Sequence, residues 1–316
     1  MTQTTTTASG RVEVKLDEKP LVYVNGEMLP KSRAAVNVFD HGLLYGDGVF
    51  EGIRVYRGRI FKLGQHLDRL YECAGRIRLD LEKHCSREEM TKILRRCVEA
   101  NELTEGYIRL VVTRGVGTLG LNPFQCPEPG VICIADQISL YSKDMYENGM
   151  RVVVAERPRI PIECLDPRIK SLNYLNNILA KVEAIDAGCL ECIMLNTDGE
   201  ISEGSGDNIF VVKDGELHTP PLTAGILAGI TRRFVINELA PMAGIQLNER
   251  SLTLDDVMGA DEVFLTGTAA EMIAVTKIGK TEADAHVIGS GTEGPITRSL
   301  RAKFRQIVTS DSVPED

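Results

Sequence analysis

The stretch Asp166–Asn177 reads Asp-Pro-Arg-Ile-Lys-Ser-Leu-Asn-Tyr-Leu-Asn-Asn, and the interpretation of the whole chain starts from it. Lys170 lies just before a helical run, after a strand-like segment at Arg151–Glu156 and an irregular, proline-containing stretch. A lysine at the mouth of such a loop can project its amine into a cleft, although most lysines are solvated surface charges. Lys170 alone therefore predicts no function.

A second stretch, Ile201–Phe210, changes the interpretation of Lys170. It reads Ile-Ser-Glu-Gly-Ser-Gly-Asp-Asn-Ile-Phe and places Glu203 in a Gly/Ser-rich turn between two strand-like runs. A lysine that can form an imine and a carboxylate held on a tight turn are the two groups that a pyridoxal phosphate site requires. The lysine carries the cofactor, and the carboxylate keeps the pyridine nitrogen protonated so that the ring accepts electrons.

The motifs Ile-Lys-Ser-Leu-Asn-Tyr and Ser-Glu-Gly-Ser-Gly-Asp-Asn-Ile-Phe resemble those of fold type IV pyridoxal-phosphate enzymes, the group of branched-chain and D-amino-acid aminotransferases. The similarity covers nearly all of the chain between its two ends, at separated motifs in the expected order. It implies an α+β fold with a smaller N-terminal α/β domain and a larger, β-rich C-terminal domain with helices. We expect a flexible tail, a small domain, a connection, a cofactor-binding domain and an acidic tail at residues 1–14, 15–137, 138–148, 149–309 and 310–316.

Length and composition are ordinary for a globular protein of about two domains. The chain has 316 residues, of which 43% are hydrophobic and 26% charged, and its formal net charge is −9. This charge argues against a general binder of nucleic acid or membrane surfaces. No apolar run approaches the roughly 20 residues of a membrane span, and the first residues lack the apolar core of a secretion signal. We therefore expect a cytoplasmic protein.

The eight cysteines are scattered through periodic segments, which predicts reduced and mostly buried thiols instead of a disulfide framework. Cys189 and Cys192 form a C-x-x-C pair. No second pair stands at metal-site spacing, so we expect neither a metal site nor redox function.

Two further sequence features suit a phosphate group. Arg69 lies on a helical pattern at Gln65–Ile77, and the planar fork of an arginine gives a phosphate two charge-assisted hydrogen bonds. A glycine-bearing loop opens a helix near Ile230 and Thr231, where free backbone amides favour anions. Taken alone, Arg69 would be an ordinary surface arginine of a helix, and the segment near Ile230 would be an ordinary helix start.

The resemblance assigns cofactor roles to these positions. It implies that Arg69, the amides of Ile230 and Thr231, and the hydroxyls of Thr231 and Thr268 hold the phosphate. Tyr174, one helical turn past Lys170, would reach the phenolic oxygen of the cofactor.

The sequence of Phe39–Tyr56 ends in Tyr-Gly-Asp-Gly-Val-Phe-Glu-Gly-Ile-Arg-Val-Tyr and alternates like a strand in its second half. Its glycines weaken an ordinary strand and indicate bulges or close approach of the backbone to a ligand. By the resemblance, Tyr45 and Phe50 supply apolar walls of the substrate side-chain pocket, with Arg54 nearby.

Two other segments resemble substrate-binding elements of the family. Tyr107 and Arg109 match a Tyr-x-Arg pair that acts at the carboxylate end of the substrate. The backbone amides of the turn at Thr268 and Ala269 would bind the same carboxylate, and the small side chains there permit close approach.

The resemblance implies transamination between branched-chain L-amino acids (leucine, isoleucine and valine) and 2-oxoglutarate. A D-amino-acid aminotransferase is one alternative, since the lysine segment and Tyr-Gly-Asp-Gly are closer to that style, but such enzymes place an Arg-x-His trap where this chain has Thr118–Asn122. An aminodeoxychorismate lyase is another, although such lyases usually lack Tyr-x-Arg. The expected partners are small amino acids and 2-oxo acids, with no nucleic acid or membrane, in a homodimer or an assembly of dimers.

Overall fold

The computed structural model describes residues 3–6, 12–15, 18–138, 140–310 and 314–315. The chain divides into two compact units, residues 1–138 with 313–316 and residues 139–312. Of the tails expected at 1–14 and 310–316, part lies outside the described residues. Strands β1 (Gln3–Thr6) and β2 (Val12–Lys15) pair with each other antiparallel.

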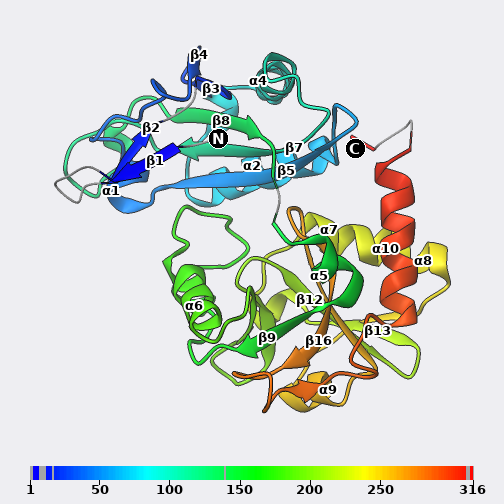
Figure 1. Cartoon of the computed structure of the whole chain (residues 1–316). Helices are drawn as coiled ribbons and strands as arrows, with labels where there is room; N and C mark the ends of the chain where they lie inside the picture. Colours follow the sequence, from blue (N-terminus) through cyan, green and yellow to red (C-terminus); the bar gives the residue numbers. More distant parts are fainter. Residues whose placement is uncertain (1–2, 7–11, 16–17, 139, 311–313, 316) are drawn as a thin grey trace. The chain divides into compact units, whose positions relative to one another are not determined.

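The described residues of the first unit form a six-stranded antiparallel sheet in the order β4-β3-β8-β7-β5-β6 (Figure 1). The sequence Asn25-Gly26 between two strand-like runs predicts a two-residue hairpin turn, and the structure confirms it. Both residues adopt the positive φ angles that such a turn requires, 47° and 102°. The strands are β3 (Leu21–Val24), β4 (Glu27–Pro30), β5 (Gly48–Tyr56), β6 (Arg59–Ile60), β7 (Glu105–Thr113) and β8 (Gly130–Asp136).

Helices cover this sheet. Helix α2 packs against β5, and α4 packs against β3 and β8. Ser86 and Glu89 have the spacing that predicts a capping box, and this capping box is present at the start of α4. The pattern at Gln65–Ile77 predicts one apolar face with Leu67, Leu70, Ala74 and Ile77. The first three are buried on α2, whereas Ile77 is half-buried at its C-cap. The helices are α1 (His41–Tyr45), α2 (Leu63–Arg76), α3 (Leu81–His84), α4 (Arg87–Ala100) and the 3-10 turn η1 (Pro123–Gln125).

In the second unit, the described residues contain a nine-stranded mixed sheet in the order β11-β10-β9-β16-β15-β12-β13-β14, with β17 beside β16. The pairs β9/β10, β9/β16 and β13/β14 are parallel. The strands are β9 (Met150–Val154), β10 (Cys192–Leu195), β11 (Ile201–Gly204), β12 (Asn208–Lys213), β13 (Glu216–Thr219), β14 (Leu247–Glu249), β15 (Glu262–Gly267), β16 (Glu271–Ile278) and β17 (His286–Val287).

The helices of the second unit pack on this sheet. Helix α5 lies against β16, α6 against β10, and α10 against β15 and β16 (Figure 1). The segment 138–148, expected as a connection, contains α5. The helical elements are α5 (Lys143–Asn148), α6 (Leu175–Asp186), η2 (Leu222–Ala224), α7 (Ile230–Phe234), the π-helical η3 (Val235–Leu239), α8 (Ala240–Ala243), α9 (Leu254–Met258) and α10 (Pro295–Val308).

Helix α6 begins later than the sequence pattern predicts. The helical run that follows Lys170 in the sequence predicts a helix from Leu172, but α6 begins at Leu175. The Ser171 hydroxyl accepts a hydrogen bond from the Asn173 amide at 3.3 Å, and such a local turn competes with helix. This turn leaves Tyr174 as the N-cap residue of α6.

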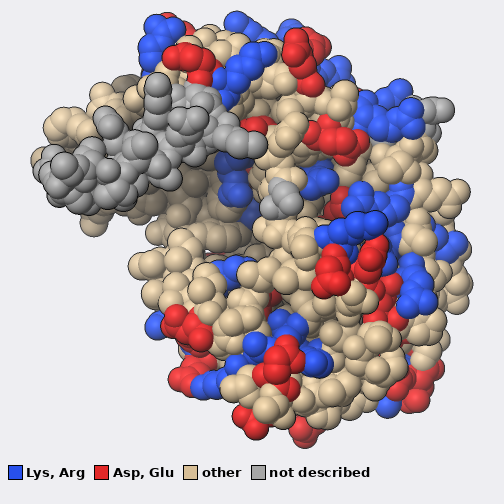
Figure 2. Space-filling model, in the orientation of Figure 1, with Lys and Arg blue, Asp and Glu red and all other residues tan. Residues whose placement is uncertain are grey.

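Surface charge of both signs is mixed on the face shown in Figure 2. On α10, for example, Arg298 and Arg301 pair with Glu293, and Arg305 pairs with Glu271 at 2.8 Å. In the part of the chain that the structure describes, no helix is long and apolar enough to cross a bilayer.

Candidate active site

The amine of Lys170 and the hydroxyl of Tyr174 lie together in the second unit. Lys170 is half-buried in the irregular stretch before α6, and its Nζ donates to Tyr174 Oη at 2.9 Å. The same Nζ lies 5.1 Å from the centre of the Tyr174 ring, within the range of a cation–π contact. The two side chains are therefore held in mutual contact at the start of α6.

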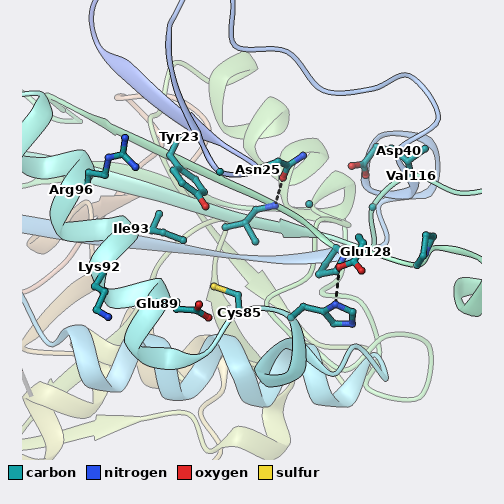
Figure 3. Close-up of a pocket in the computed structure, with 17 residues that line it drawn as sticks. Tyr23, Asn25, Asp40, Cys85, Glu89, Lys92, Ile93, Arg96, Val116 and Glu128 are labelled. Carbon is teal, nitrogen blue, oxygen red and sulfur yellow. Dashed lines mark hydrogen bonds and ion pairs between the residues drawn. The ribbon is translucent and has the colours of Figure 1, made fainter.

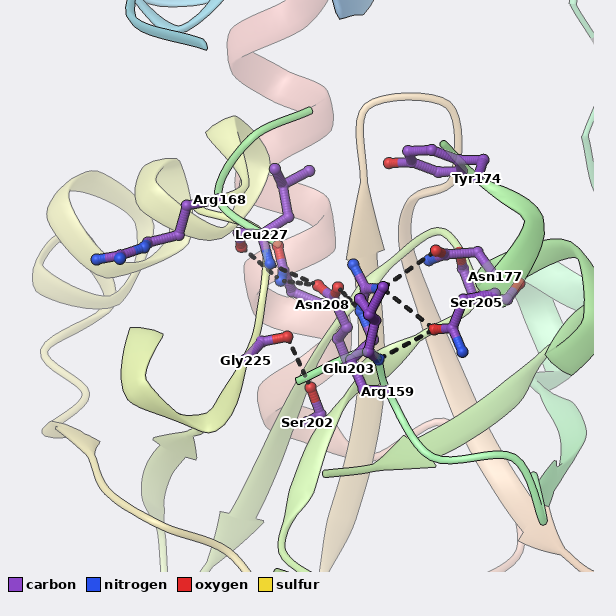
Figure 4. Close-up of polar contacts among 12 residues, drawn as sticks. Arg159, Arg168, Tyr174, Asn177, Ser202, Glu203, Ser205, Asn208, Gly225 and Leu227 are labelled. Atoms are coloured by element: carbon purple, nitrogen blue, oxygen red, sulfur yellow. Dashed lines mark hydrogen bonds and ion pairs between the residues drawn. The ribbon is translucent and has the colours of Figure 1, made fainter. Parts of the chain in front are cut away.

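Glu203 is buried at the end of β11 and accepts three hydrogen bonds (Figure 4). Its Oε1 accepts from Arg159 Nε at 2.9 Å. Its Oε2 accepts from Asn208 Nδ2 at 3.1 Å and from the Leu227 amide at 3.0 Å. Charge-assisted bonds of this kind are shorter and stronger than neutral ones, so the three donors fix the orientation of the carboxylate.

Hydrogen bonds also join the Glu203 turn to α6. Arg159 Nη1 donates to Asn177 Oδ1 at 3.2 Å, and Asn177 Nδ2 donates to the Ser205 carbonyl at 2.8 Å. Asn177 lies on the helix that Tyr174 begins. Helix α6 therefore has as its N-cap the tyrosine that contacts Lys170 and, three residues later, contributes the asparagine that hydrogen-bonds to the Glu203 turn.

Sequence reasoning missed Arg159, Asn177 and Asn208. Arg159 stands in a proline-containing loop with no periodic pattern, so nothing local distinguishes it from a surface arginine. Asn208 offered a better signal, since it directly follows the Gly/Ser-rich turn of Glu203.

The expected phosphate-binding site at the start of α7 has Gly229 as its first residue. Gly229 is the N-cap residue and makes no side-chain cap, so the first amides of the helix receive no capping bond from it. A Cβ at position 229 would lie 2.0 Å from Asn208 Oδ1, which excludes a side chain there. Asn208 therefore contacts both Glu203 and the helix start that contains Ile230 and Thr231.

The turn between β15 and β16 contains Thr268 and Ala269, both half-buried. Just before it, the hydroxyl of Thr266 is buried, and no described residue hydrogen-bonds to its Oγ1. The second unit thus contains four groups that suit a phosphorylated, imine-forming cofactor. The start of α7 and the buried Thr266 hydroxyl suit a phosphate, the Lys170 amine can form an imine, and the Glu203 carboxylate is held in one orientation.

The expected substrate residues of the first unit gather on one face of the sheet. Phe50, Gly52 and Arg54 alternate along β5 and therefore share a face. Opposite them on β7, Arg109 Nη2 donates to Tyr107 Oη at 3.3 Å, and its guanidinium carbon lies 4.7 Å from the centre of the Phe50 ring.

Gly52 is the residue that makes room for this group. A Cβ at position 52 would lie 1.7 Å from Tyr107 Oη, because the tyrosine ring lies across the glycine. The sequence predicts a bulge or close approach of the backbone to a ligand at these glycines. At Gly52, the group that approaches closely is the Tyr107 side chain of the neighbouring strand.

Tyr45 is the last residue of α1. Its hydroxyl donates to the Leu119 carbonyl at 2.6 Å, and its ring meets the His41 imidazole edge to face at 5.0 Å. The contact joins α1 to the loop between β7 and β8, the loop that contains Thr118–Asn122.

Arg69 is part of a buried ion cluster. Its Nε and Nη2 donate to the two oxygens of Glu51 at 2.7 and 2.8 Å, and His66 Nδ1 lies 2.7 Å from Glu51 Oε2. Burial opposes the charge of Glu51, but the Arg69 guanidinium and the His66 imidazole outweigh it and hold the pKa of Glu51 well below its usual range. Because Glu51 alternates with Phe50 and Gly52, the cluster lies on the other face of β5.

A separate pocket of about 670 Å³ lies in the first unit, lined among others by Tyr23, Cys85, Lys92 and Arg96 (Figure 3). None of the residues predicted for catalysis, cofactor or substrate lines it.

The thiols meet the sequence prediction, because all eight cysteines are free and six of them are buried. Among the described residues, no cluster of histidine, cysteine, aspartate and glutamate could hold a metal ion.

Comparison with known proteins adds the family. Residues 48–278 match the family described as amino-transferase class IV. The chain belongs to the class IV aminotransferases. Membership confirms the expected fold, the aminotransferase activity and the pyridoxal phosphate cofactor of this class.

Individual relatives of this class span nearly the full chain. A Methanocaldococcus jannaschii protein named "Putative branched-chain-amino-acid aminotransferase" is 47% identical over 288 residues, 91% of this chain and 96% of its own. A D-alanine aminotransferase of Bacillus licheniformis is 35% identical over 291 residues, 92% of this chain and 98% of its own.

Solved structures of this class have the same fold. The branched-chain aminotransferase of Escherichia coli superimposes with a TM-score of 0.84 at 34% identity, covering 95% of this chain and 98% of that one. The enzyme of Thermobaculum terrenum, solved in its PLP form, gives 0.81 at 30% identity, with 93% and 95% covered.

Proposed function

We propose that this class IV aminotransferase exchanges amino groups between branched-chain L-amino acids (leucine, isoleucine and valine) and 2-oxoglutarate. The observation that supports this choice is the group formed by Tyr107, Arg109 and Phe50 on one sheet face. An arginine–tyrosine pair suits a carboxylate, and it lies beside an aromatic ring. The high identity to a relative with a branched-chain name supports the same choice. The loop Thr118–Asn122 contains no Arg-x-His sequence, which disfavours a D-amino-acid specialist.

The cofactor would be held in the second unit by groups of complementary chemistry. When bound, pyridoxal phosphate supplies an electron-accepting ring that stabilises negative charge at the substrate α-carbon. Glu203 faces a protonated pyridine nitrogen in this proposal, and its three hydrogen bonds prevent it from turning away. The proposed cofactor ligands of the second unit are Lys170, Tyr174, Glu203, Ile230, Thr231 and Thr268. The phosphate role of Arg69, a residue of the first unit whose guanidinium binds Glu51, stays a prediction.

Lys170 is the proposed catalytic base. Its amine takes the proton from the α-carbon of the substrate and later returns a proton to the 2-oxo acid that is being aminated. The Tyr174 hydroxyl accepts a hydrogen bond from this amine at 2.9 Å and so fixes the orientation of the Lys170 amino group. The hydrogen-bonded link through Asn177 keeps the helix start at a fixed place relative to the Glu203 turn.

Substrate recognition in this proposal combines charge with apolar surface. In the first unit, Arg109 and Tyr107 are proposed to act at the carboxylate end of the substrate. In the second unit, the amides of Thr268 and Ala269 are proposed to bind a substrate carboxylate. Phe50 and Tyr45 form apolar walls, with Arg54 nearby. Arg109 is itself packed on Phe50, so its guanidinium loses little side-chain freedom when it binds a carboxylate.

We also propose that the enzyme works as a homodimer or an assembly of dimers. Helix α6 exposes a row of large apolar side chains, with Leu175 65% and Ile185 57% exposed. In the first unit, Leu119 and Leu121 are 70% and 79% exposed. Apolar patches of this kind mark interfaces, and a second copy of the chain is the proposed occupant. Analytical ultracentrifugation tests it, and a monomer at micromolar concentration would contradict it.

The location that fits this chemistry is the cytoplasm. Eight free cysteines, of which Cys164 is exposed at the surface, are stable where thiols are kept reduced. Cell fractionation with a tagged chain tests this expectation.

A donor assay tests the proposed function. Purified enzyme is offered L-leucine, L-valine, L-glutamate or D-alanine, each with a suitable 2-oxo acid acceptor, and product amino acid is quantified. The expected result is that kcat/KM for L-leucine and L-valine exceeds that for D-alanine by at least about a hundredfold, a gap of roughly 2.7 kcal/mol. D-alanine as the preferred donor would instead establish the D-amino-acid alternative.

A further inference from the structure

Two buried carboxylates beside the Glu203 turn have no part in the reaction as derived above. Glu191, 2% exposed, accepts from the amides of Cys192 and Ser205 through Oε1, each at 2.8 Å. Its Oε2 lies 3.2 Å from Lys181 Nζ of α6. Lys181 thus balances the charge of Glu191. Through its two amide hydrogen bonds, the Glu191 carboxylate connects Ser205, in the turn after Glu203, with Cys192 at the start of β10.

The second carboxylate, Asp207, has no such cation in contact among the described residues. Asp207 is 7% exposed, and its Oδ2 lies 3.5 Å from the hydroxyl of Tyr141. Its Oδ1 fills the space beside Gly267, where a Cβ would lie only 2.0 Å away. The Asp207 carbonyl also accepts from the Gly204 amide at 2.6 Å, directly after Glu203.

The position of Asp207 connects two parts of the proposed site. On one side is the strand end that carries Glu203. On the other is Gly267, the first residue of the turn that contains Thr268 and Ala269. Any charge on Asp207 therefore lies directly beneath a turn that is proposed to bind phosphate and substrate carboxylate.

The charged groups around Asp207 disfavour its ionisation. Burial raises the pKa of Asp207 to about 7, and the negative charges of Glu191 and Glu203 act in the same direction. Lys181 and the Tyr141 hydroxyl oppose this shift but do not cancel it.

We propose that Asp207 is a positioning residue beneath the Gly267–Ala269 turn, which binds anionic groups tightly while the Asp207 carboxyl is protonated and more weakly once it ionises. This inference rests on the proposed function, since that proposal makes the turn an anion site. The reason is Coulombic, because a negative charge in a dry environment repels an anion bound a few ångströms above it. The side chain acts through the turn and does not touch the reacting atoms.

The first test uses a spectroscopic signature of the cofactor-free, full-length protein. Infrared difference spectra between pH 6 and pH 8 are expected to show one buried carboxyl losing its proton in the wild type. The band is expected to be absent in Asp207→Asn and unchanged in Asp198→Asn, an exposed aspartate at a hairpin turn. If no buried carboxyl titrates in the wild type, or if the band persists in Asp207→Asn, the proposal is overturned.

The second test measures anion binding. The dissociation constant of pyridoxal 5′-phosphate is measured for wild type and Asp207→Asn at both pH values. The dissociation constant of the wild type divided by that of Asp207→Asn is expected to rise about tenfold from pH 6 to pH 8. The same quotient for wild type and Asp198→Asn is expected to stay constant. A ratio for Asp207→Asn that does not change with pH would overturn the proposal. Failure of the donor assay would refute the proposed substrates alone, because neither test on Asp207 requires turnover.

Discussion

Arg159 Nε lies 2.9 Å from Glu203 Oε1, and both side chains are almost completely buried. The two residues are 44 positions apart in the sequence, so the pair depends on the folded second unit. Removal of one partner of such a pair leaves an uncompensated buried charge, which costs more than the pair contributes.

Arg159→Ala is therefore expected to lower the free energy of unfolding by about 3–5 kcal/mol. Urea denaturation of the cofactor-free protein measures this loss. The neighbouring Arg157 is exposed and 3.8 Å from Glu183, so Arg157→Ala is the matched control and is expected to change stability by less than about 0.5 kcal/mol. Equal losses of unfolding free energy in the two variants would show that the buried pair stabilises the fold no more than an exposed pair does.

Glu203→Gln retains the shape of the side chain and removes its charge. If the carboxylate faces a protonated pyridine nitrogen, kcat is expected to fall about 10²–10³-fold, the usual effect of losing one preorganised electrostatic contact. The absorbance spectrum of the bound cofactor is expected to change with it. The exposed Glu163 provides the control substitution, Glu163→Gln. A Glu203→Gln enzyme with full kcat would remove Glu203 from the proposed mechanism.

The cluster of Glu51, Arg69 and His66 predicts a loss of stability in acid. Because the folded-state pKa of Glu51 is depressed, its contribution is fully present above the ordinary value of 4.5 and is lost as the pH falls below that value. The stability difference between wild type and Glu51→Gln is thus expected to be large at pH 7 and to shrink below about pH 4.5. Glu72→Gln, at an exposed helix ion pair, is the control. A difference that stays constant down to pH 3 would contradict the assigned pKa direction.

Gly52→Ala tests the substrate face of the first unit. The new methyl group would displace the Tyr107 hydroxyl, so KM for L-leucine is expected to rise about tenfold, a loss of about 1.4 kcal/mol in binding. Gly75→Ala on α2 meets no atom within 4 Å and is expected to leave KM unchanged while adding up to about 1 kcal/mol of stability. An unchanged KM in Gly52→Ala would argue that Tyr107 does not contact the substrate.

Local signals in the sequence were sufficient for several elements. The turn at Asn25 and Gly26, the capping box at Ser86 and Glu89, and the proline that opens α10 all act through neighbours in the chain, so the pattern alone predicts them. The start of α6 was predicted too early, because the competing hydrogen bond of Ser171 involves a weak local preference that periodicity does not reveal.

Partners far apart in the sequence could not be predicted in the same way. The motif containing Glu203 indicated a cofactor carboxylate, but nothing in the sequence indicated that Arg159 binds it. The same holds for Glu51, whose bond to Arg69 exists only because α2 packs on β5. Buried polar pairs of this kind are set by tertiary packing, and one sequence without its relatives contains no signal for them.

In the proposed function, Lys170 carries the cofactor and moves the proton. The most direct measurement is borohydride reduction of the holoenzyme, followed by peptide mapping and by turnover assays of Lys170→Ala. We predict that a phosphopyridoxyl group is recovered on the peptide containing Lys170, and that Lys170→Ala loses multiple turnover while Lys143→Ala, at a side chain 90% exposed, remains fully active. Recovery of the group on another lysine, or sustained turnover by Lys170→Ala, would contradict the account.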